Sequence, residues 1–350
     1  MIHLLTTGGT IASAPGVDGR NVSGTLTGDD LAATLASELP SPLQPVTESL
    51  LQRPSNAIDT GNLQTIESRC RALLARGDID GLVLTHGTDT LEDTAFYLHL
   101  TLGDCAKPIV LTGSQWALHE TGSDAARNLA DAIRVAAEPA SRGQGVLVVF
   151  DQEVHSAALA RKDSSYRLRA FNSPGFGPLG QVDHGVVHYS FYTAPTRGLP
   201  SGPSLPRVDM LHAGAGSTSL ILAAQRDGAD GLVIGGLGRG HVPPDWMHEI
   251  EQVRAAGLPV AITSSTASGP VRAVYEFPGS LAALLAAGVM PAGALSTRQA
   301  RILLMLLLSR GHRDTDLAGQ VCRASAWGSV GCTASPGPRS IPDEATEAGR

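Results

Sequence analysis

The sequence of 350 residues predicts an α/β fold in two domains. Short apolar runs ending in Gly, Ser, Thr, Asn or Asp are followed by amphipathic stretches, a pattern typical of strands that alternate with helices around a parallel sheet. A stretch rich in Pro, Gly and Ser breaks this alternation between about Gly177 and Arg207, as a linker between two α/β units would. A hydrophobic content of 42% supplies enough apolar side chains for both cores.

The candidate strands lie on both sides of this linker. They are the runs IHLL, GLVLTHG, KPIVLTGS and GVLVVFDQ before it, and VDMLHAG, DGLVIGG and LPVAITSS after it. We therefore expect an N-terminal domain over residues 1–189, a linker over 190–207 and a C-terminal domain over 208–312. In the C-terminal domain, Ser296 and Gln299 have the spacing of a capping box, which predicts a helix that begins there and continues through ILLMLLLSR.

The C-terminal end of the chain has a different composition. Beyond Gly311 the apolar period disappears, and the polar residues that follow bury too little surface to offset their ordering entropy. We expect residues 313–350 to form a disordered tail. No two of the four cysteines form a C-x-x-C pair, which indicates reduced thiols and neither a metal site nor a disulfide scaffold; they are Cys70, Cys105, Cys322 and Cys332.

Charge and hydropathy exclude several classes of partner. The formal net charge of -7 offers no broad basic face to nucleic acid or anionic lipid. The start, MIHLLTTGGTIAS, lacks the basic flank and long apolar stretch of a secretory signal, and the apolar run at 302–308 is too short to span a bilayer. We expect a cytoplasmic protein that acts on small molecules, with no nucleic-acid or membrane partner.

Two strand ends carry unusual threonine-rich segments. TTGGTIAS covers Thr6 to Ser13 directly after the first strand, and THGTDTLED covers Thr85 to Asp93 directly after GLVL. Ligands bind at the ends of parallel strands, where loops and helix N-termini converge with unsatisfied N–H groups. In both segments a glycine precedes a threonine, so the backbone can approach a ligand closely. The hydroxyls of Thr10 and Thr88 are expected to face one pocket.

A threonine hydroxyl becomes a useful nucleophile only when a neighbouring group takes its proton. Asp89 supplies a carboxylate beside Thr88. Lys162 is the candidate amine, because lysine is scarce in this chain and this one follows the strand GVLVVFDQ, at the same edge of the same predicted sheet.

Taken singly, each of these features has a structural explanation as well. TTGGTIAS could be a phosphate loop, although it lacks the G-x-G-x-x-G spacing, and a Thr-Asp pair at a helix start is commonly an N-cap. A single lysine such as Lys162 is often a solvated surface residue, and His86 fits a hydrogen-bonded core residue. The segment GGLGRGH, from Gly235 to His241, fits a tight turn as well as a binding loop.

Together, the two threonine segments resemble the signature motifs of the bacterial-type L-asparaginase family. The similarity extends from residue 2 to about residue 310, through KPIVLTGS, FGPLG, DGLVIGGLG and STRQAR. It implies a larger N-terminal domain with a doubly wound sheet and a smaller C-terminal α/β domain. It also implies a homodimer or homotetramer whose subunits share active sites, and a reaction that needs neither a metal nor an organic cofactor.

The resemblance also assigns roles to individual residues. The family's nucleophile falls on Thr10, its second catalytic pair on Thr88 and Asp89, and its lysine on Lys162. The substrate is expected to contact Asp89 and a further set of residues. The serine that holds its α-carboxylate corresponds to Ser55, with Asn56 beside it where the family usually has Gln or Asp, and the acidic residue lent by the adjacent subunit corresponds to Glu276.

The chain departs from the family pattern in two further places. A flexible lid follows the first motif, here about Ser13 to Thr27, and many members carry in it a tyrosine that assists the nucleophile. This lid has none, the nearest positions being Arg20 and Asn21. Arg239 and His241 stand where well-known relatives have asparagines, which puts the substrate preference in question.

The expected activity is hydrolysis of the side-chain amide of L-asparagine to L-aspartate and ammonia through a threonyl acyl-enzyme. A glutaminase-asparaginase is the nearest alternative. The amide-hydrolysing subunit of a tRNA-dependent amidotransferase is disfavoured by the charge of -7. A third hypothesis is a small-molecule-binding homologue with impaired catalysis, as the missing lid tyrosine would permit.

Overall fold

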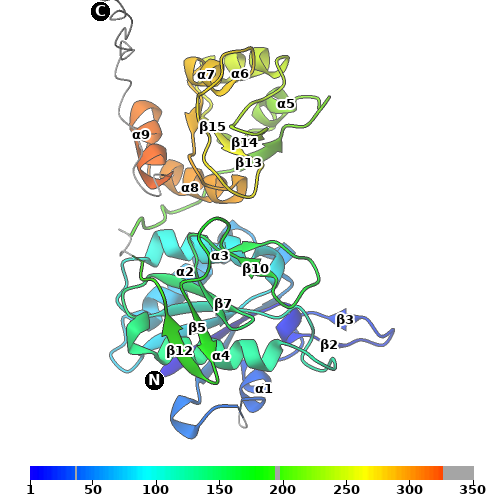
Figure 1. Ribbon diagram of the computed structural model, residues 1–350, viewed down its shortest axis with the longest axis vertical. Coiled ribbons are helices and arrows are strands. Elements are labelled where there is room, and N and C mark those ends of the chain that lie inside the picture. The colour runs from blue at the N-terminus through cyan, green and yellow to red at the C-terminus, as the bar shows by residue number, and fades with distance from the viewer. Residues whose placement is uncertain (36–37, 194–197, 326–350) are drawn as a thin grey trace, which may run out of the picture.

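Two α/β units follow each other along the chain (Figure 1). The computed structural model describes residues 1–35, 38–193 and 198–325. The first unit is built on an eight-stranded sheet with strand order β12-β11-β8-β7-β6-β5-β1-β4, and the second on a four-stranded sheet with order β13-β14-β15-β16. The predicted fold class, with the larger sheet first, is confirmed. The predicted boundaries at 189/190 and 207/208 stay predictions.

The larger sheet is mixed rather than purely parallel. Strands β4, β1, β5, β6 and β7 run parallel, whereas β8, β11 and β12 are added antiparallel at one edge. The bounds of the strands are β1 Ile2–Gly8, β4 Val46–Arg53, β5 Gly81–Thr85, β6 Ile109–Thr112, β7 Val146–Phe150, β8 Glu153–Ser156, β11 Gly180–Asp183 and β12 Val186–Tyr189. The carboxyl ends of the parallel strands therefore lie along one edge of this sheet.

Helices cover both faces of this sheet, because its central strands are apolar on both sides. In β5, Leu82 and Leu84 belong to the core beneath α2 and α3, while Val83 between them belongs to the core beneath α1 and α4. Successive side chains of a strand point to opposite faces, so one continuous apolar run serves both layers. The helices are α1 Gly28–Ala33, α2 Thr60–Leu74, α3 Thr88–Leu102 and α4 Ala125–Ala137.

Short elements decorate the first unit. The lid segment contains the antiparallel pair β2 and β3, and a second small antiparallel sheet pairs β9 with β10. Their bounds, with those of the 3-10 helices, are η1 Thr10–Ala12, β2 Ala14–Pro15, β3 Asn21–Val22, η2 Ser41–Leu43, η3 Ser55–Ala57, η4 Pro139–Ser141, β9 Arg161–Lys162 and β10 Phe171–Asn172.

The second unit alternates parallel strands with helices, as its sequence predicts. Its elements are β13 Val208–His212, α5 Ile221–Arg226, β14 Gly231–Gly236, α6 Trp246–Ala255, β15 Val260–Ser264, α7 Leu281–Ala286, β16 Met290–Pro291, α8 Thr297–Ser309 and α9 Asp314–Ser325. The predicted capping box at the start of α8 is confirmed: Ser296 Oγ accepts from the Gln299 amide, and Gln299 Oε1 accepts from the Ser296 amide.

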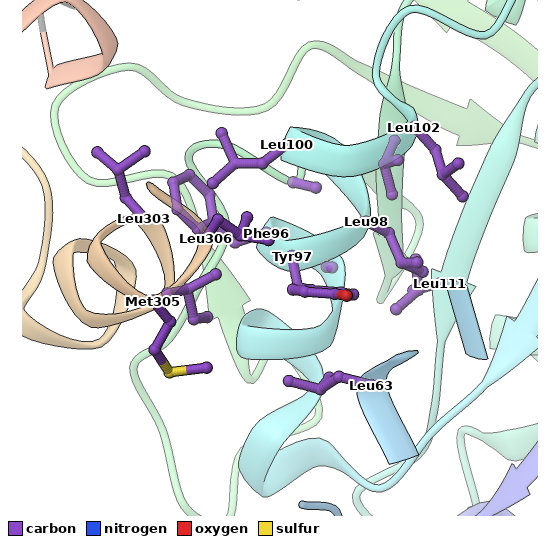
Figure 2. Packing of buried hydrophobic residues seen from close by; sticks show 14 of the residues in the cluster. Leu63, Phe96, Tyr97, Leu98, Leu100, Leu102, Leu111, Leu303, Met305 and Leu306 are labelled. Atoms are coloured by element: carbon purple, nitrogen blue, oxygen red, sulfur yellow. The ribbon is translucent and has the colours of Figure 1, made fainter. Parts of the chain in front are cut away.

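Helix α8 packs on both units. Its buried face is apolar almost all round, which suits a helix enclosed from more than one side. Leu303 and Leu306 belong to the same apolar cluster as Phe96 and Leu100 of α3, and Figure 2 shows these side chains side by side. The contact between α3 and α8 thus joins the two units through buried hydrocarbon.

Three predictions can be compared with the structure: those on the C-terminal tail, on the cysteines and on a membrane-spanning helix. The prediction of a tail from residue 313 is wrong for its first part, because α9 occupies Asp314–Ser325 and buries Leu317 and Val321; residues 326–350 lie outside the described residues. Cys70 and Cys105 are free, as predicted, whereas Cys322 is disulfide-bonded, so the prediction of reduced thiols is wrong for Cys322. Among the described residues, no helix has the length and hydropathy that crossing a bilayer requires.

Candidate active site

The two threonine turns touch each other at the carboxyl edge of the larger sheet. A Cβ added to Gly9 would lie 2.4 Å from the Gly87 Cα and amide nitrogen, and one added to Gly87 would lie 2.7 Å from Ser55 Oγ. Glycine is therefore required at both positions, because any side chain would force these backbones apart. Thr10 and Thr88 each follow one of the touching glycines, so the predicted meeting of the two motifs is a feature of the fold.

The turn that carries Thr10 is strained in a way that only glycine tolerates. Gly8 has φ 100° and Gly9 has φ 87°, and the Gly9 amide donates to the Arg53 carbonyl at 3.2 Å. Thr10 then begins the 3-10 helix η1, whose N-cap Gly9 offers no side chain to the helix amides. Thr10 is half-buried, and in the described part of the chain its hydroxyl makes no hydrogen bond. The hydroxyl is thus free to react.

The turn that carries Thr88 is densely bonded instead. Thr88 is buried, and its Oγ1 accepts from Lys162 Nζ at 2.7 Å and donates to Gln115 Oε1 at 3.3 Å. Lys162 Nζ also donates to Asp89 Oδ1 at 2.7 Å. The predicted grouping of Thr88, Asp89 and Lys162 is present in the structure as a continuous chain of hydrogen bonds.

The N-cap explanation for Thr88 and Asp89 does not hold. The N-cap of α3 is Gly87, which makes no side-chain cap, and Thr88 is the first residue of the helix. The first amides of α3 thus lack a side-chain cap of the usual kind, and the Gly87 that precedes them touches Gly9 of the Thr10 turn. Uncapped amides at a helix start can stabilise negative charge on a bound group.

Lys162 reaches the site by a different path from the one predicted. It lies in β9, which pairs with β10 and not with the larger sheet. Its side chain is 15% exposed and that of Asp89 71%, so the salt bridge is shielded at the lysine and open at the carboxylate. The surface-residue explanation for Lys162 is therefore wrong. The position of Lys162 is set by the path of the chain after β8, and not by the edge of the larger sheet as predicted.

Two partners of this network were not among the predicted site residues. Gln115 follows β6 at the same edge of the sheet, so the end of the KPIVLTGS strand was a usable signal for it. Glu92 is buried, and its Oε2 accepts from the Lys162 amide at 2.6 Å. Burial raises the pKa of the Glu92 carboxyl, opposed by the charge of Arg298. Nothing in the local sequence distinguishes Glu92 from an ordinary helical glutamate.

Of the residues expected to bind substrate, Ser55 lies against the Thr88 turn, whereas Asn56 and Glu276 are exposed. Ser55 is buried at the start of η3 against Gly87, and its carbonyl accepts from Thr90 Oγ1 at 2.7 Å. Asn56 beside it is exposed. Glu276 lies on the exposed segment between β15 and α7 in the second unit, where the described residues give it no hydrogen bond or ion pair.

The lid forms an exposed hairpin that extends away from the first unit (Figure 1). Strands β2 and β3 pair within it, and Asn21 Nδ2 donates to Glu120 Oε1 at 3.1 Å. Arg20 points into solvent with its side chain 89% exposed. In the described part of the chain, no hydrogen bond or ion pair joins either of the two residues nearest the missing tyrosine to Thr10.

Two further predicted features have structural explanations. His86 is fully buried, with Nδ1 bonded to the Gly87 carbonyl at 2.8 Å and Nε2 to Thr94 Oγ1 at 2.9 Å, so it is a core residue that shapes the Thr88 turn. Burial lowers its pKa. The segment from Gly235 to His241 makes a tight turn closed by the bridge between Leu237 and His241, with the His241 ring 5.0 Å from that of Phe277.

The arrangement can support attack by a hydroxyl, movement of a proton along a lysine relay and stabilisation of an oxyanion. Within residues 1–35, 38–193 and 198–325, no group of three or more His, Cys, Asp or Glu could hold a metal ion.

Comparison with known proteins agrees with this geometry. Residues 1–194 match the family model described as "Asparaginase, N-terminal", and residues 207–319 match "Glutaminase/Asparaginase C-terminal domain". The chain is 36% identical to an L-asparaginase of Bacillus licheniformis over 310 residues, covering 88% of this chain and 95% of that protein. It is also 36% identical to a probable L-asparaginase of Deinococcus radiodurans, over 90% of this chain and 95% of that one.

A solved structure shares the fold. The crystal structure of a probable cytoplasmic L-asparaginase from Campylobacter jejuni superposes with a TM-score of 0.82 at 27% sequence identity, over 92% of this chain and 98% of that one.

Proposed function

Since the chain belongs to the asparaginase family, we propose that it hydrolyses the side-chain amide of L-asparagine to L-aspartate and ammonia. The observation that carries this proposal is the hydrogen-bonded chain from Thr88 through Lys162 to Asp89, placed beside a second threonine by the contact between Gly9 and Gly87. An unbonded hydroxyl next to a proton relay is the arrangement that acyl transfer requires.

In the first step, the Thr10 hydroxyl attacks the carbon of the side-chain amide. The carbonyl oxygen becomes an oxyanion, which backbone amides of the two glycine-capped turns stabilise. Collapse of the tetrahedral intermediate breaks the C–N bond. The departing nitrogen takes up the proton given up by the Thr10 hydroxyl and leaves as ammonia. A β-acyl ester on Thr10 remains.

In the second step, water replaces ammonia as the reacting group. Thr88 passes a proton from this water toward Lys162, whose charge Asp89 balances. For this the Lys162 amine must be neutral, so it gives a proton to solvent before the cycle begins and recovers its neutral form when the proton taken from water passes on to the Thr10 oxygen. Breaking the acyl ester releases aspartate and returns the proton to Thr10. The proton of Thr10 thus leaves with ammonia, a proton from water replaces it by way of Thr88 and Lys162, and the proposed cycle requires no cofactor.

The substrate contacts follow from the same site. Ser55 lies against Gly87 and is assigned to the α-carboxylate of the substrate, with Asn56 and Asp89 beside it. Glu276 is assigned to the α-ammonium group of a substrate in an adjacent subunit, which would explain its exposure in a single chain. This role requires a homodimer or a homotetramer, and the expected location is the cytoplasm.

A glutaminase-asparaginase activity is the second candidate. It is supported by the C-terminal family model, whose description includes both activities, and Arg239 and His241 stand where well-known relatives have asparagines, a departure that concerns substrate preference. The absence of a lid tyrosine keeps a catalytically impaired homologue as a further alternative.

Ammonia release from L-asparagine, L-glutamine and D-asparagine tests the proposal directly. L-asparagine should give the highest kcat/KM, and Lys162→Met should abolish release from it while the circular dichroism spectrum stays unchanged. Comparable kcat/KM for L-glutamine would establish the second candidate. No ammonia from any of these amides would refute an amidohydrolase and favour the impaired homologue.

A further inference from the structure

The first turn of α8, in the second unit, contacts both elements that carry the proton relay. Arg298 Nε and Nη2 donate to the two carboxylate oxygens of Asp93 in α3, at 2.9 and 2.6 Å. Nη2 also donates to the main-chain carbonyl of Asp89 at 2.7 Å. One guanidinium thus forms a salt bridge through two nitrogens with the Asp93 carboxylate and also donates a hydrogen bond to the backbone of Asp89, a residue of the relay.

The backbone that Arg298 contacts is irregular. Thr90 has φ -125° and ψ 15°, so α3 is kinked directly after Asp89. A kinked first turn needs support from outside the helix, because regular helical hydrogen bonds do not hold it. Thr90 Oγ1 supplies one support through the Ser55 carbonyl, and Arg298 supplies another from the opposite unit.

The second relay element is held from the same turn of α8. Arg161, next to Lys162 in β9, donates to Gln299 Oε1, and Gln299 Nε2 donates to the Ala158 carbonyl at 2.8 Å. Glu92 lies 3.5 Å from Arg298 and accepts the Lys162 amide. The strand that presents Lys162 and the helix start that presents Thr88 and Asp89 are therefore aligned by one helical turn.

We infer that Arg298 is a positioning residue for the reaction, and this inference rests on the proposed function. It touches none of the reacting groups, and it acts by holding the Asp89 backbone and the Glu92 side chain so that Lys162 Nζ bridges Thr88 and Asp89. The docking of the second unit on α3 thereby becomes part of the catalytic machinery of the first.

The capping box keeps this turn of α8 in place. Because Ser296 and Gln299 fix the start of α8, Arg298 in its first turn has a defined position along α3. The guanidinium is about one-third exposed, at 35%, so its contacts serve geometry more than stability. Stability of the interface comes mainly from the apolar packing of α8 on α3.

The test compares two arginines of α8 in the full chain. Arg298→Met removes the contacts with α3, whereas Arg301→Met removes a contact inside the second unit, from Arg301 Nε to the Val208 carbonyl at 2.8 Å. We expect Arg298→Met to lower kcat for L-asparagine by ~10-fold or more, which corresponds to ~1.4 kcal/mol of activation free energy lost through misplacement of the relay, while KM changes by less than threefold. Arg301→Met should keep the wild-type kcat even where its Tm falls equally.

Arg298→Lys provides the conservative variant. Lysine keeps the charge but cannot bond Asp93 through two nitrogens and Asp89 at once, so its kcat should lie between those of Arg298→Met and wild type. If Arg298→Met does not fold, Arg298→Lys decides alone: a kcat reduced several-fold at unchanged KM supports the positioning role, and a wild-type kcat overturns it.

Outcomes for the inference and for the proposed function are distinct. A wild-type chain that releases no ammonia from L-asparagine refutes both. An active wild-type chain whose Arg298→Met variant has a kcat within twofold of it refutes only the positioning role. So does a loss of kcat in Arg298→Met and Arg301→Met that merely follows the fall in Tm.

Discussion

The two threonine turns share a sequence pattern and differ in almost every contact. Each places a glycine N-cap before a threonine at the carboxyl edge of the larger sheet. Thr88 is buried and bonded to Lys162 and Gln115, whereas Thr10 is half-buried with an unbonded hydroxyl. The difference teaches that the Thr88 turn fixes its hydroxyl in a chain of hydrogen bonds, while the Thr10 turn leaves its hydroxyl unbonded, as the proposed role of nucleophile requires.

The largest expected effect separates the two threonines. Thr10→Ala should lower kcat by at least ~10⁴-fold, the range found when a nucleophile is removed, and leave the free energy of unfolding unchanged because its hydroxyl has no partner. Thr88→Val should also abolish turnover, but it should destabilise the fold by ~1–3 kcal/mol because it leaves the Lys162 amine without a buried acceptor. Ammonia assays and urea unfolding measure both quantities.

A trapped intermediate sharpens this comparison further. Mass spectrometry of the enzyme quenched during turnover should locate the acyl group on Thr10. An adduct on Thr88 would reverse the roles of the two turns.

An intermediate effect is expected where the turns touch. Gly9 has φ 87° and ψ -174°, a conformation almost restricted to glycine, and a Cβ there would lie 2.4 Å from Gly87. Gly9→Ala should cost ~3 kcal/mol or more of unfolding free energy, from backbone strain and overpacking together, and reduce kcat severely.

Gly19 in the lid provides the matched control. Its φ is also positive, at 75°, but nothing lies within 4 Å of an added Cβ. Gly19→Ala should cost only ~1 kcal/mol. Equal losses in the two variants would show that strain alone matters and that the contact between the turns does not.

The smallest expected effect is a pH dependence confined to the Thr88 turn. The buried ring of His86 bonds the Gly87 carbonyl, and burial lowers its pKa, while residues 6–13 contain no titratable side chain. A histidine with a lowered folded-state pKa binds a proton more readily when unfolded, so its contribution to stability is present above pH ~6.5 and declines as the pH falls through the folded-state pKa.

Urea midpoints at pH 7.5 and 5.0 test this dependence. The wild-type midpoint should fall more between these two values than that of His86→Gln, which has no ring to protonate. Equal falls would assign the acid sensitivity to groups elsewhere, such as His99, whose pKa burial lowers to about 4.

Much of the site was accessible from the sequence because its residues follow strand ends. Apolar runs that end in Gly-Thr predicted both turns, and Asp89 is adjacent to Thr88 in the chain. Gln115, after the next strand, could have been found by the same reasoning. Strand β4 was missed, since its burial pattern of half-exposed positions lacks a continuous apolar run. Helix α9 was missed because two apolar residues suffice to pack a short helix on α8.

The amino-acid sequence by itself determined the α/β class and the two glycine-threonine turns, and it supplied the candidate reacting groups, because strand periodicity and turn chemistry are local properties. Tertiary structure alone decided that the turns touch, that Lys162 lies in a separate small sheet, and that Arg298 of the other unit bonds Asp93 and the backbone of Asp89. These contacts join residues up to 209 positions apart, and chain packing rather than local preference brings such residues together.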